Sequence, residues 1–162
     1  MVKDVPNKLS RQELVDILNQ VVPGEFDFVY LRFDFSNHCN VGYAFVNFTS
    51  TRALLHFYRA RVGKRWNMFS SEKVLQQTVY ATIQGKIALV NKFRNSAVMA
   101  VQEEWRPQIF YSDGALRGQP EPFPEVTRTQ RRHWLTAVRL HLSRPALSFL
   151  LSAFVPLKYV HS

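Results

Sequence analysis

The chain has 162 residues, 46% of them hydrophobic, which suits one domain with an extension and excludes a globally disordered protein. Its 21 lysines and arginines outnumber 12 acidic residues, and the net charge of +9 favours a polyanionic partner, either nucleic acid or an anionic membrane surface. The single cysteine, Cys39, excludes an internal disulfide and a Cys-rich zinc site, and it indicates a reducing compartment, the nucleus or the cytoplasm.

The first part of the chain predicts a strand, a helix and two further strands. Residues 1–5 alternate in polarity and run into a Pro-Asn turn, which indicates a short strand. Ser10 and Glu13 have the spacing of a capping box, and the apolar residues that follow recur at helical spacing. Residues 26–35 and 41–48 are rich in aromatic and β-branched side chains and are separated by a polar loop, so each predicts a strand.

The next part predicts a helix, a strand and one additional helix. The second helix begins near Ser50 and ends at Gly63. Residues 74–83 supply a fourth strand, and Gly85 opens a third helix. The order βαββαβ is that of an α+β, ferredoxin-like sandwich, in which two helices cover one face of a four-stranded antiparallel sheet. The other face is expected to stay open, with the additional C-terminal helix near it.

The third predicted strand carries the sequence VGYAFVNF at residues 41–48. A common RNA-binding octamer runs Lys/Arg, Gly, Phe/Tyr, Gly/Ala, Phe, Val, any residue, Phe/Tyr, and only Val41 departs from it. Because side chains alternate across a strand, Tyr43 and Phe45 share the open face, where rings are suited to stacking bases. The alternative is that both rings are core residues, covered for example by the third helix lying across the sheet.

Two basic residues are expected beside these rings. Lys3 on the first strand falls on the open face, where its ammonium can meet a phosphate, and Arg32 on the second strand shares that face. The first strand of such a domain usually carries a further aromatic residue, and Met1 stands at that position here. The predicted platform therefore has two rings with a methionine next to them.

Further basic residues lie after the second predicted helix and on the third. Lys64 and Arg65 beside Trp66 can hold phosphate and stack a base; the alternative is a tryptophan that closes the core edge beside two solvated charges. Lys86 and Lys92 on the third helix predict a basic flank for the RNA backbone, and the alternative there is a solvated charged face.

Several stretches together resemble the C-terminal RNA-recognition motif (RRM) of the Mei-two-like family of meiosis regulators. They are DVPNK at 4–8, DFVYL at 27–31, CNVGYAFVNF at 39–48, GKRW at 63–66, SEK at 71–73, YATIQGK at 80–86 and FRNS at 93–96. In this family valine is usual at the position of Val41. The resemblance implies an RRM over residues 1–114, extended by a C-terminal helix, that binds RNA in proteins governing meiosis or differentiation. Longer members carry two further such motifs upstream.

The composition changes after residue 114. Residues 115–127 are rich in proline and predict a linker. Residues 128–162 form a basic and apolar tail, in which a basic amphipathic helix can contact a membrane surface, RNA or a protein, and the alternative is a poorly specified extension. No stretch reaches the ~20 apolar residues that cross a bilayer, and the first residues lack the apolar core of a secretory signal.

No residue pattern predicts an enzyme, a cofactor or a metal site. The five histidines are scattered without metal-ligand spacing, and the six glycines form no phosphate-binding loop. The sequence therefore predicts a single-stranded RNA-binding domain that uses base stacking on the open face of the sheet. The alternative is a protein-interaction module in which the same sheet, the third helix or the tail docks a partner. Phosphate contacts would make RNA binding steeply dependent on salt, which separates the two hypotheses.

Overall fold

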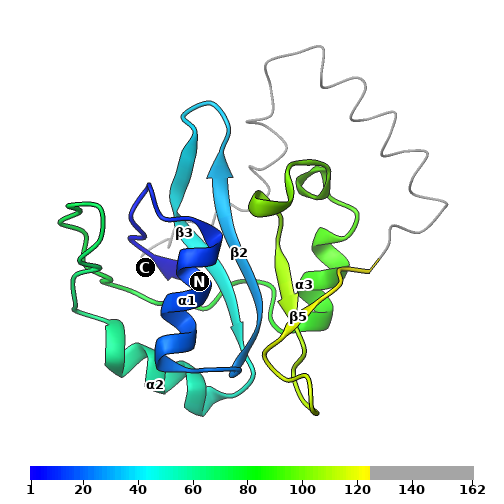
Figure 1. The fold of residues 1–162 in the computed structure, drawn as a ribbon. Helices are drawn as coiled ribbons and strands as arrows, with labels where there is room; N and C mark the ends of the chain where they lie inside the picture. Colours follow the sequence, from blue (N-terminus) through cyan, green and yellow to red (C-terminus); the bar gives the residue numbers. More distant parts are fainter. Residues whose placement is uncertain (125–162) are drawn as a thin grey trace, which may run out of the picture. The chain divides into compact units, whose positions relative to one another are not determined.

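The computed structural model describes residues 1–124, which lie within one compact unit. The tail predicted over residues 128–162 lies outside these described residues. Figure 1 shows the ribbon, coloured along the chain. The elements in chain order are β1 (Val2–Lys3), α1 (Arg11–Val21), β2 (Phe26–Asp34), β3 (Cys39–Phe48), α2 (Thr51–Arg61), α3 (Lys86–Phe93), the short 3-10 helices η1 (Ala97–Ala100) and η2 (Glu103–Trp105), β4 (Gln108–Phe110) and β5 (Pro120–Glu121).

The sheet of the described residues is antiparallel, with the strand order β1-β3-β2-β4-β5. The α+β fold predicted from the sequence is therefore confirmed, with five strands in the sheet where four were expected. The additional strands β4 and β5 extend the sheet beyond β2. The stretch expected to be a linker thus contains β5, whose Glu121 is paired with Ile109 of β4.

The predicted fourth strand over residues 74–83 is not a regular strand. The chain does run beside β1: the Lys3 amide donates to the Gln77 carbonyl at 3.2 Å, and the Val79 amide donates to the Met1 carbonyl at 3.0 Å. These two hydrogen bonds form one isolated β-bridge, between Val2 and Thr78, and not a longer strand pairing. The strand β1 has only two residues, and at Asp4 the backbone turns with a φ of 57°. Residues 74–83 therefore have no longer strand beside them with which to pair.

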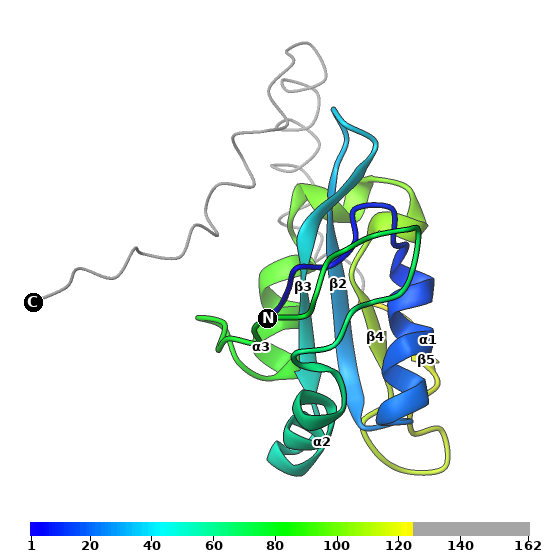
Figure 2. The ribbon, with the colours of Figure 1, turned by 90° about the vertical axis from the view of Figure 1, so that its left-hand side faces the viewer.

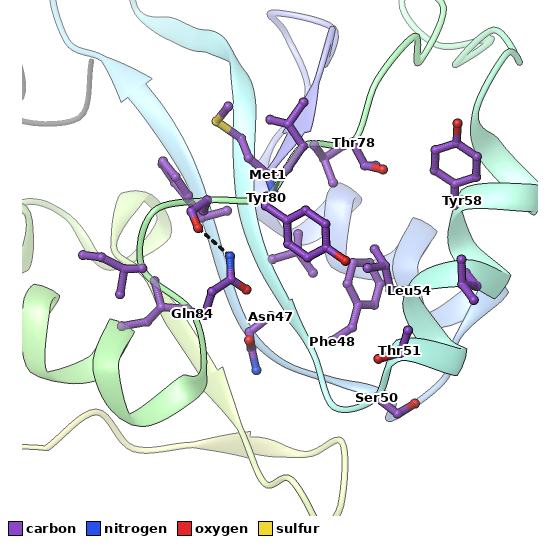
Figure 3. Close-up of a pocket in the computed structure, with 18 residues that line it drawn as sticks. Met1, Asn47, Phe48, Ser50, Thr51, Leu54, Tyr58, Thr78, Tyr80 and Gln84 are labelled. Carbon is purple, nitrogen blue, oxygen red and sulfur yellow. Dashed lines mark hydrogen bonds between the residues drawn. The ribbon is translucent and has the colours of Figure 1, made fainter. Parts of the chain in front are cut away.

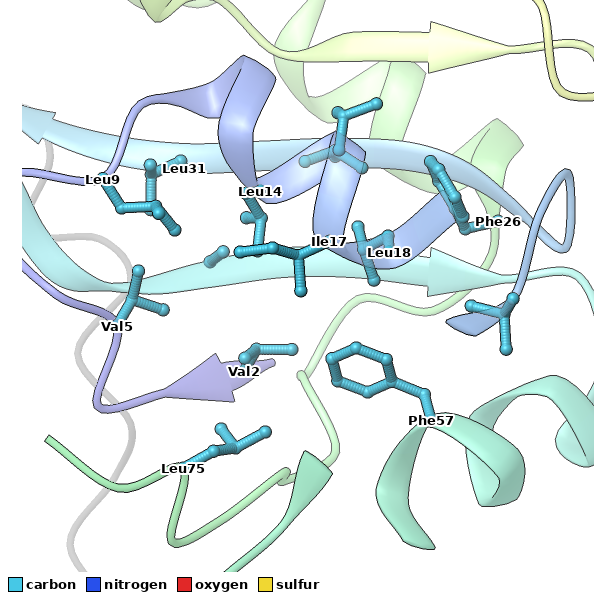
Figure 4. Close-up of a cluster of buried hydrophobic side chains, with 14 of the residues drawn as sticks. Val2, Val5, Leu9, Leu14, Ile17, Leu18, Phe26, Leu31, Phe57 and Leu75 are labelled. Atoms are coloured by element: carbon cyan, nitrogen blue, oxygen red, sulfur yellow. The ribbon is translucent and has the colours of Figure 1, made fainter. Parts of the chain in front are cut away.

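The main core lies between the sheet and the two helices α1 and α2. Figure 4 shows Leu14 and Leu18 of α1 and Phe57 of α2 pointing into this core, all fully buried. The helix α1 begins where the sequence predicts, because Ser10 and Glu13 form both hydrogen bonds of the capping box. Each buried large apolar side chain contributes roughly 1.5–3 kcal/mol by leaving water, so this layer fixes the orientation of the sheet.

The helix α3 covers part of the opposite face of the sheet. Figure 2 shows α3 and α1 on opposite sides of β2 and β3. The ring of Phe93 at the end of α3 lies 5.5 Å from that of Phe28 and 4.9 Å from that of Tyr30, centroid to centroid. The face predicted to be open is therefore partly covered by the additional helix. No helix in residues 1–124 is long and apolar enough to cross a membrane.

Candidate nucleic-acid interface

Lys3, Arg32 and Tyr43 come together on the α3 side of the sheet, each from a different strand. Lys3 of β1 lies directly opposite Tyr43 of β3 in the antiparallel register, so the two side chains share a face. Arg32 of β2 donates a hydrogen bond from Nη1 to the Tyr43 hydroxyl, and its Cζ lies 5.8 Å from the centre of that ring. All three residues are half-buried. We call this group the Tyr43 cluster.

The second ring of the octamer, Phe45, is only 5% exposed. Its ring lies parallel to that of Tyr30, with centroids 6.4 Å apart, and edge-on to that of Tyr43 at 5.8 Å. Tyr30 is in turn packed against Phe93 of α3. The expectation that Phe45 offers an open ring is not met in this arrangement, because the additional helix shields the part of the sheet where it lies. Of the two octamer rings, Tyr43 is the more accessible to a base.

Burial also changes the chemistry of Tyr30. Its side chain is 3% exposed, and removal from water raises the pKa of its hydroxyl to about 12, because the phenolate would lose its hydration. Arg32 opposes this shift and Tyr43 adds to it. Tyr30 is therefore a neutral residue of this face at physiological pH.

A buried polar network holds the extension against the sheet. Asp27 is 5% exposed and accepts hydrogen bonds from Asn47 Nδ2 at 2.7 Å and from Ser112 Oγ at 2.8 Å. A β-bulge between Phe26 and Phe28 turns Asp27 toward these partners. The sequence analysis missed this site, although an acidic residue within an aromatic, β-branched strand was a visible signal. We call Asp27, Asn47 and Ser112, with Lys86 and Glu121 described next, the polar latch.

Lys86 belongs to this latch, which corrects its expected place on an exposed basic flank. Its side chain is 19% exposed, and its Nζ donates to the Phe110 carbonyl at 2.7 Å, to Ser112 Oγ at 3.4 Å and to the carboxylate of Glu121. The ammonium at the start of α3 therefore ties the helix to β4 and β5. Lys92, at the other end of α3, is exposed.

The group Lys64, Arg65 and Trp66 does not form a stacking site with an open ring. Trp66 is 4% exposed and belongs to the main core, with Arg61 placed 5.6 Å from its ring centre. Its burial supports the alternative of a tryptophan that closes the core edge. Arg65 forms an exposed ion pair with Glu72 at 3.5 Å, and Lys64 is exposed. Phosphate contact by these two cations stays a prediction.

Residues 1–124 hold no cluster of three or more histidine, cysteine or acidic side chains that could bind a metal ion. The cationic and aromatic groups described above can instead bind a phosphate and stack on a base, which are the two contacts that single-stranded nucleic acid offers.

Comparisons with known proteins agree with this chemistry. Residues 1–94 match the family described as RNA recognition motif 2. The chain is 48% identical over 132 residues to Meiosis protein mei2 of Schizosaccharomyces pombe, a match covering 82% of this chain and 18% of that protein. It is 44% identical over 132 residues to Protein MEI2-like 4 of Oryza sativa subsp. japonica and to Protein MEI2-like 1 of Arabidopsis thaliana, covering 82% of this chain and 13% and 14% of those proteins. The chain thus spans less than a fifth of the length of these relatives.

Proposed function

The chain belongs to the RNA recognition motif 2 family, and on that premise we propose that it binds single-stranded RNA through the Tyr43 cluster on its sheet. The observation that carries this proposal is the placement of Tyr43 between Lys3 and Arg32. A ring flanked by two cations offers a base a surface to stack on and gives the adjoining phosphates their counter-charges. Arg32 also fixes the tilt of the ring through its hydrogen bond, so the stacking surface is preorganised.

A binding experiment with the full chain tests this proposal. Fluorescence anisotropy would measure its affinity for a random single-stranded RNA across a series of salt concentrations. We expect the logarithm of the binding constant to fall with the logarithm of salt by ~0.7 for each phosphate neutralised. The variant Tyr43→Ala should lose ~1–3 kcal/mol of binding free energy, the usual contribution of one stacked base.

Tyr43→Phe is the matched control, because it keeps the ring and removes only the hydroxyl that accepts from Arg32. We expect this variant to retain most of the affinity, and circular dichroism would verify that both variants are folded. Equal affinity of the wild-type protein and Tyr43→Ala at every salt concentration would contradict the proposal.

A protein-interaction role is the second candidate, and one feature of α3 favours it. Ile87 of α3 is 79% exposed, which is unusual for a large apolar side chain on a short helix. A partner docked there would bind with little dependence on salt. Affinity that is insensitive to Tyr43 but lost in Ile87→Ser would assign the function to α3.

We further propose that the domain acts on RNA in meiosis or differentiation, in the nucleus or the cytoplasm. The name of the Schizosaccharomyces pombe relative, Meiosis protein mei2, and the 48% identity to it support this role. Crosslinking of the tagged protein to RNA in dividing and differentiating cells, with localisation of the tag by microscopy, would test it. The absence of any change in recovered RNA between the two cell states would speak against it.

A further inference from the structure

A groove opens beside the Tyr43 cluster, between α2 and the segment that follows Thr78. It has a volume of about 360 Å³, which falls within the range of ~300–1,000 Å³ typical of small-molecule sites. Its lining residues come from the end of β3, one side of α2 and residues 78–84, with Met1, Val2 and Leu89 completing the lining, as Figure 3 shows in part. None of these lining side chains is an acid, a lysine or an arginine.

Two tyrosines stand at the groove with much of their surface in solvent. Tyr80 is 85% exposed and Tyr58 of α2 is 44% exposed. In Figure 3 the ring of Tyr80 extends from its segment toward Leu54 of α2. Exposed rings of this size at an uncharged groove are suited to contact with a flat aromatic ligand, because such contact buries both surfaces.

Two amide side chains supply hydrogen-bonding groups at the same groove. Asn47 donates through Nδ2 to Asp27, and Gln84 donates through Nε2 to the Ala81 carbonyl. Because these bonds use the amide nitrogens, the amide oxygens serve as acceptors for a ligand. A nucleobase presents N–H donors along its edge together with a stacking face, so it matches both kinds of group.

The helix that forms one wall of the groove, α2, carries basic side chains and no acidic one. Arg59 is exposed on α2, the helix that forms one wall, and Arg52 on the same helix is exposed and lies 3.2 Å from Glu25. A nucleobase can therefore bind in the groove, whose lining side chains carry no charge, while its phosphate contacts a basic side chain of α2.

The groove also adjoins the proposed RNA surface. Met1 and Phe45 line it, and Phe45 packs against the ring of Tyr43 at 5.8 Å. Resting on the function proposed above, we propose that this groove binds a further nucleobase of the RNA strand whose nucleotide stacks on Tyr43, one that a longer strand can supply. Tyr58 and Tyr80 hold the base, while Arg59 faces its phosphate.

RNA length separates this inference from the function it rests on. The full chain would be titrated with random single-stranded RNAs of a short and a long length, about four and ten nucleotides, chosen around the ~4–16 nucleotides that small binding folds cover. Tyr80→Ala and Tyr58→Ala should weaken binding of the long RNA by about fivefold or more, the effect of one lost stacking ring. Binding of the short RNA should change less, because the Tyr43 cluster alone can hold it.

Phe69→Ala is the matched control, since Phe69 is 44% exposed, as Tyr58 is, but does not line the groove. It should leave both affinities unchanged, and photocrosslinking of a 4-thiouridine RNA should mark the peptide that contains Tyr80. If Tyr43→Ala weakens binding while both groove variants bind the long RNA like wild type, the groove inference fails and the proposed function stands. If no RNA binds at any length, both fail. The same groove variants would also be tested for binding of an apolar peptide. If they lose the peptide while their RNA affinity is unchanged, the groove binds a protein partner and the inference is wrong.

Discussion

The two faces of the sheet are covered by helices in different ways. On one face, α1 and α2 bury apolar side chains such as Leu18 and Phe57 against the sheet. On the other face, α3 contributes Leu89 and Phe93 but is fastened by the polar latch, through Lys86 and Glu121. The stabilisation from apolar burial is proportional to the buried area, so it is spread over many side chains. The stabilisation from the polar latch depends on a few hydrogen bonds and one ion pair. The α3 face is therefore the one that a local change can open.

The largest effect is expected in the apolar face. Phe57→Ala removes a fully buried ring of α2 and should lower the free energy of unfolding by ~3–5 kcal/mol, because the cavity is only partly refilled. Urea denaturation followed by circular dichroism would measure it. A loss below ~1 kcal/mol would show that this layer is not the main source of stability.

A smaller and more local effect is expected in the α3 face. Lys86→Met keeps the apolar stem but leaves the Phe110 carbonyl, Ser112 and Glu121 without the ammonium, at a cost of ~1–3 kcal/mol. Amide hydrogen exchange should accelerate in α3 and leave α1 protected. Lys64→Met, at an exposed lysine outside the latch, is the control. Equal acceleration in both helices would mean that the two faces open as one unit.

The burial of Tyr30 under α3 predicts a dependence on alkaline pH. Its pKa is about 12 in the folded protein and 10.0 in its unshifted form, so the folded state retains the proton over this interval. Stability from this group is complete below pH 10 and is lost as the pH rises toward 12. Absorbance at 295 nm should show one late tyrosine ionisation that Tyr30→Phe removes. Ionisation of all tyrosines together near pH 10 would show that α3 does not shield this ring.

The smallest effect is expected at the surface, away from both faces. Arg65→Ala breaks the ion pair with Glu72, whose two side chains are 59% and 86% exposed. Such pairs contribute ~0–1 kcal/mol because solvent screens the charges, so the free energy of unfolding should hardly change. Salt-dependent RNA binding by the same variant would report separately on the predicted phosphate contact. A large loss of stability would show that the bridge between Arg65 and Val74 depends on this side chain.

Local patterns in the sequence were sufficient to predict the central elements. The capping box of Ser10 and Glu13 set the start of α1, and the alternation of residues 41–48 put Ala44 in the core and Tyr43 on the opposite face. The same alternation placed Lys3 and Arg32 beside Tyr43. These features depend on neighbours a few residues apart, which is the range that helical and strand periodicity describes.

The tertiary structure alone decided what covers each face. Alternation assigns Phe45 to a face but carries no information on whether a later helix shields it, and α3 does so. Lys86 looked like a surface cation because its partner Glu121 lies 35 residues away, on a strand that the proline-rich composition did not predict. The strand predicted over 74–83 is likewise reduced to one bridge with the two-residue strand β1. Contacts between distant segments are set by packing and by the closure of long loops, and residue patterns within one segment do not encode them.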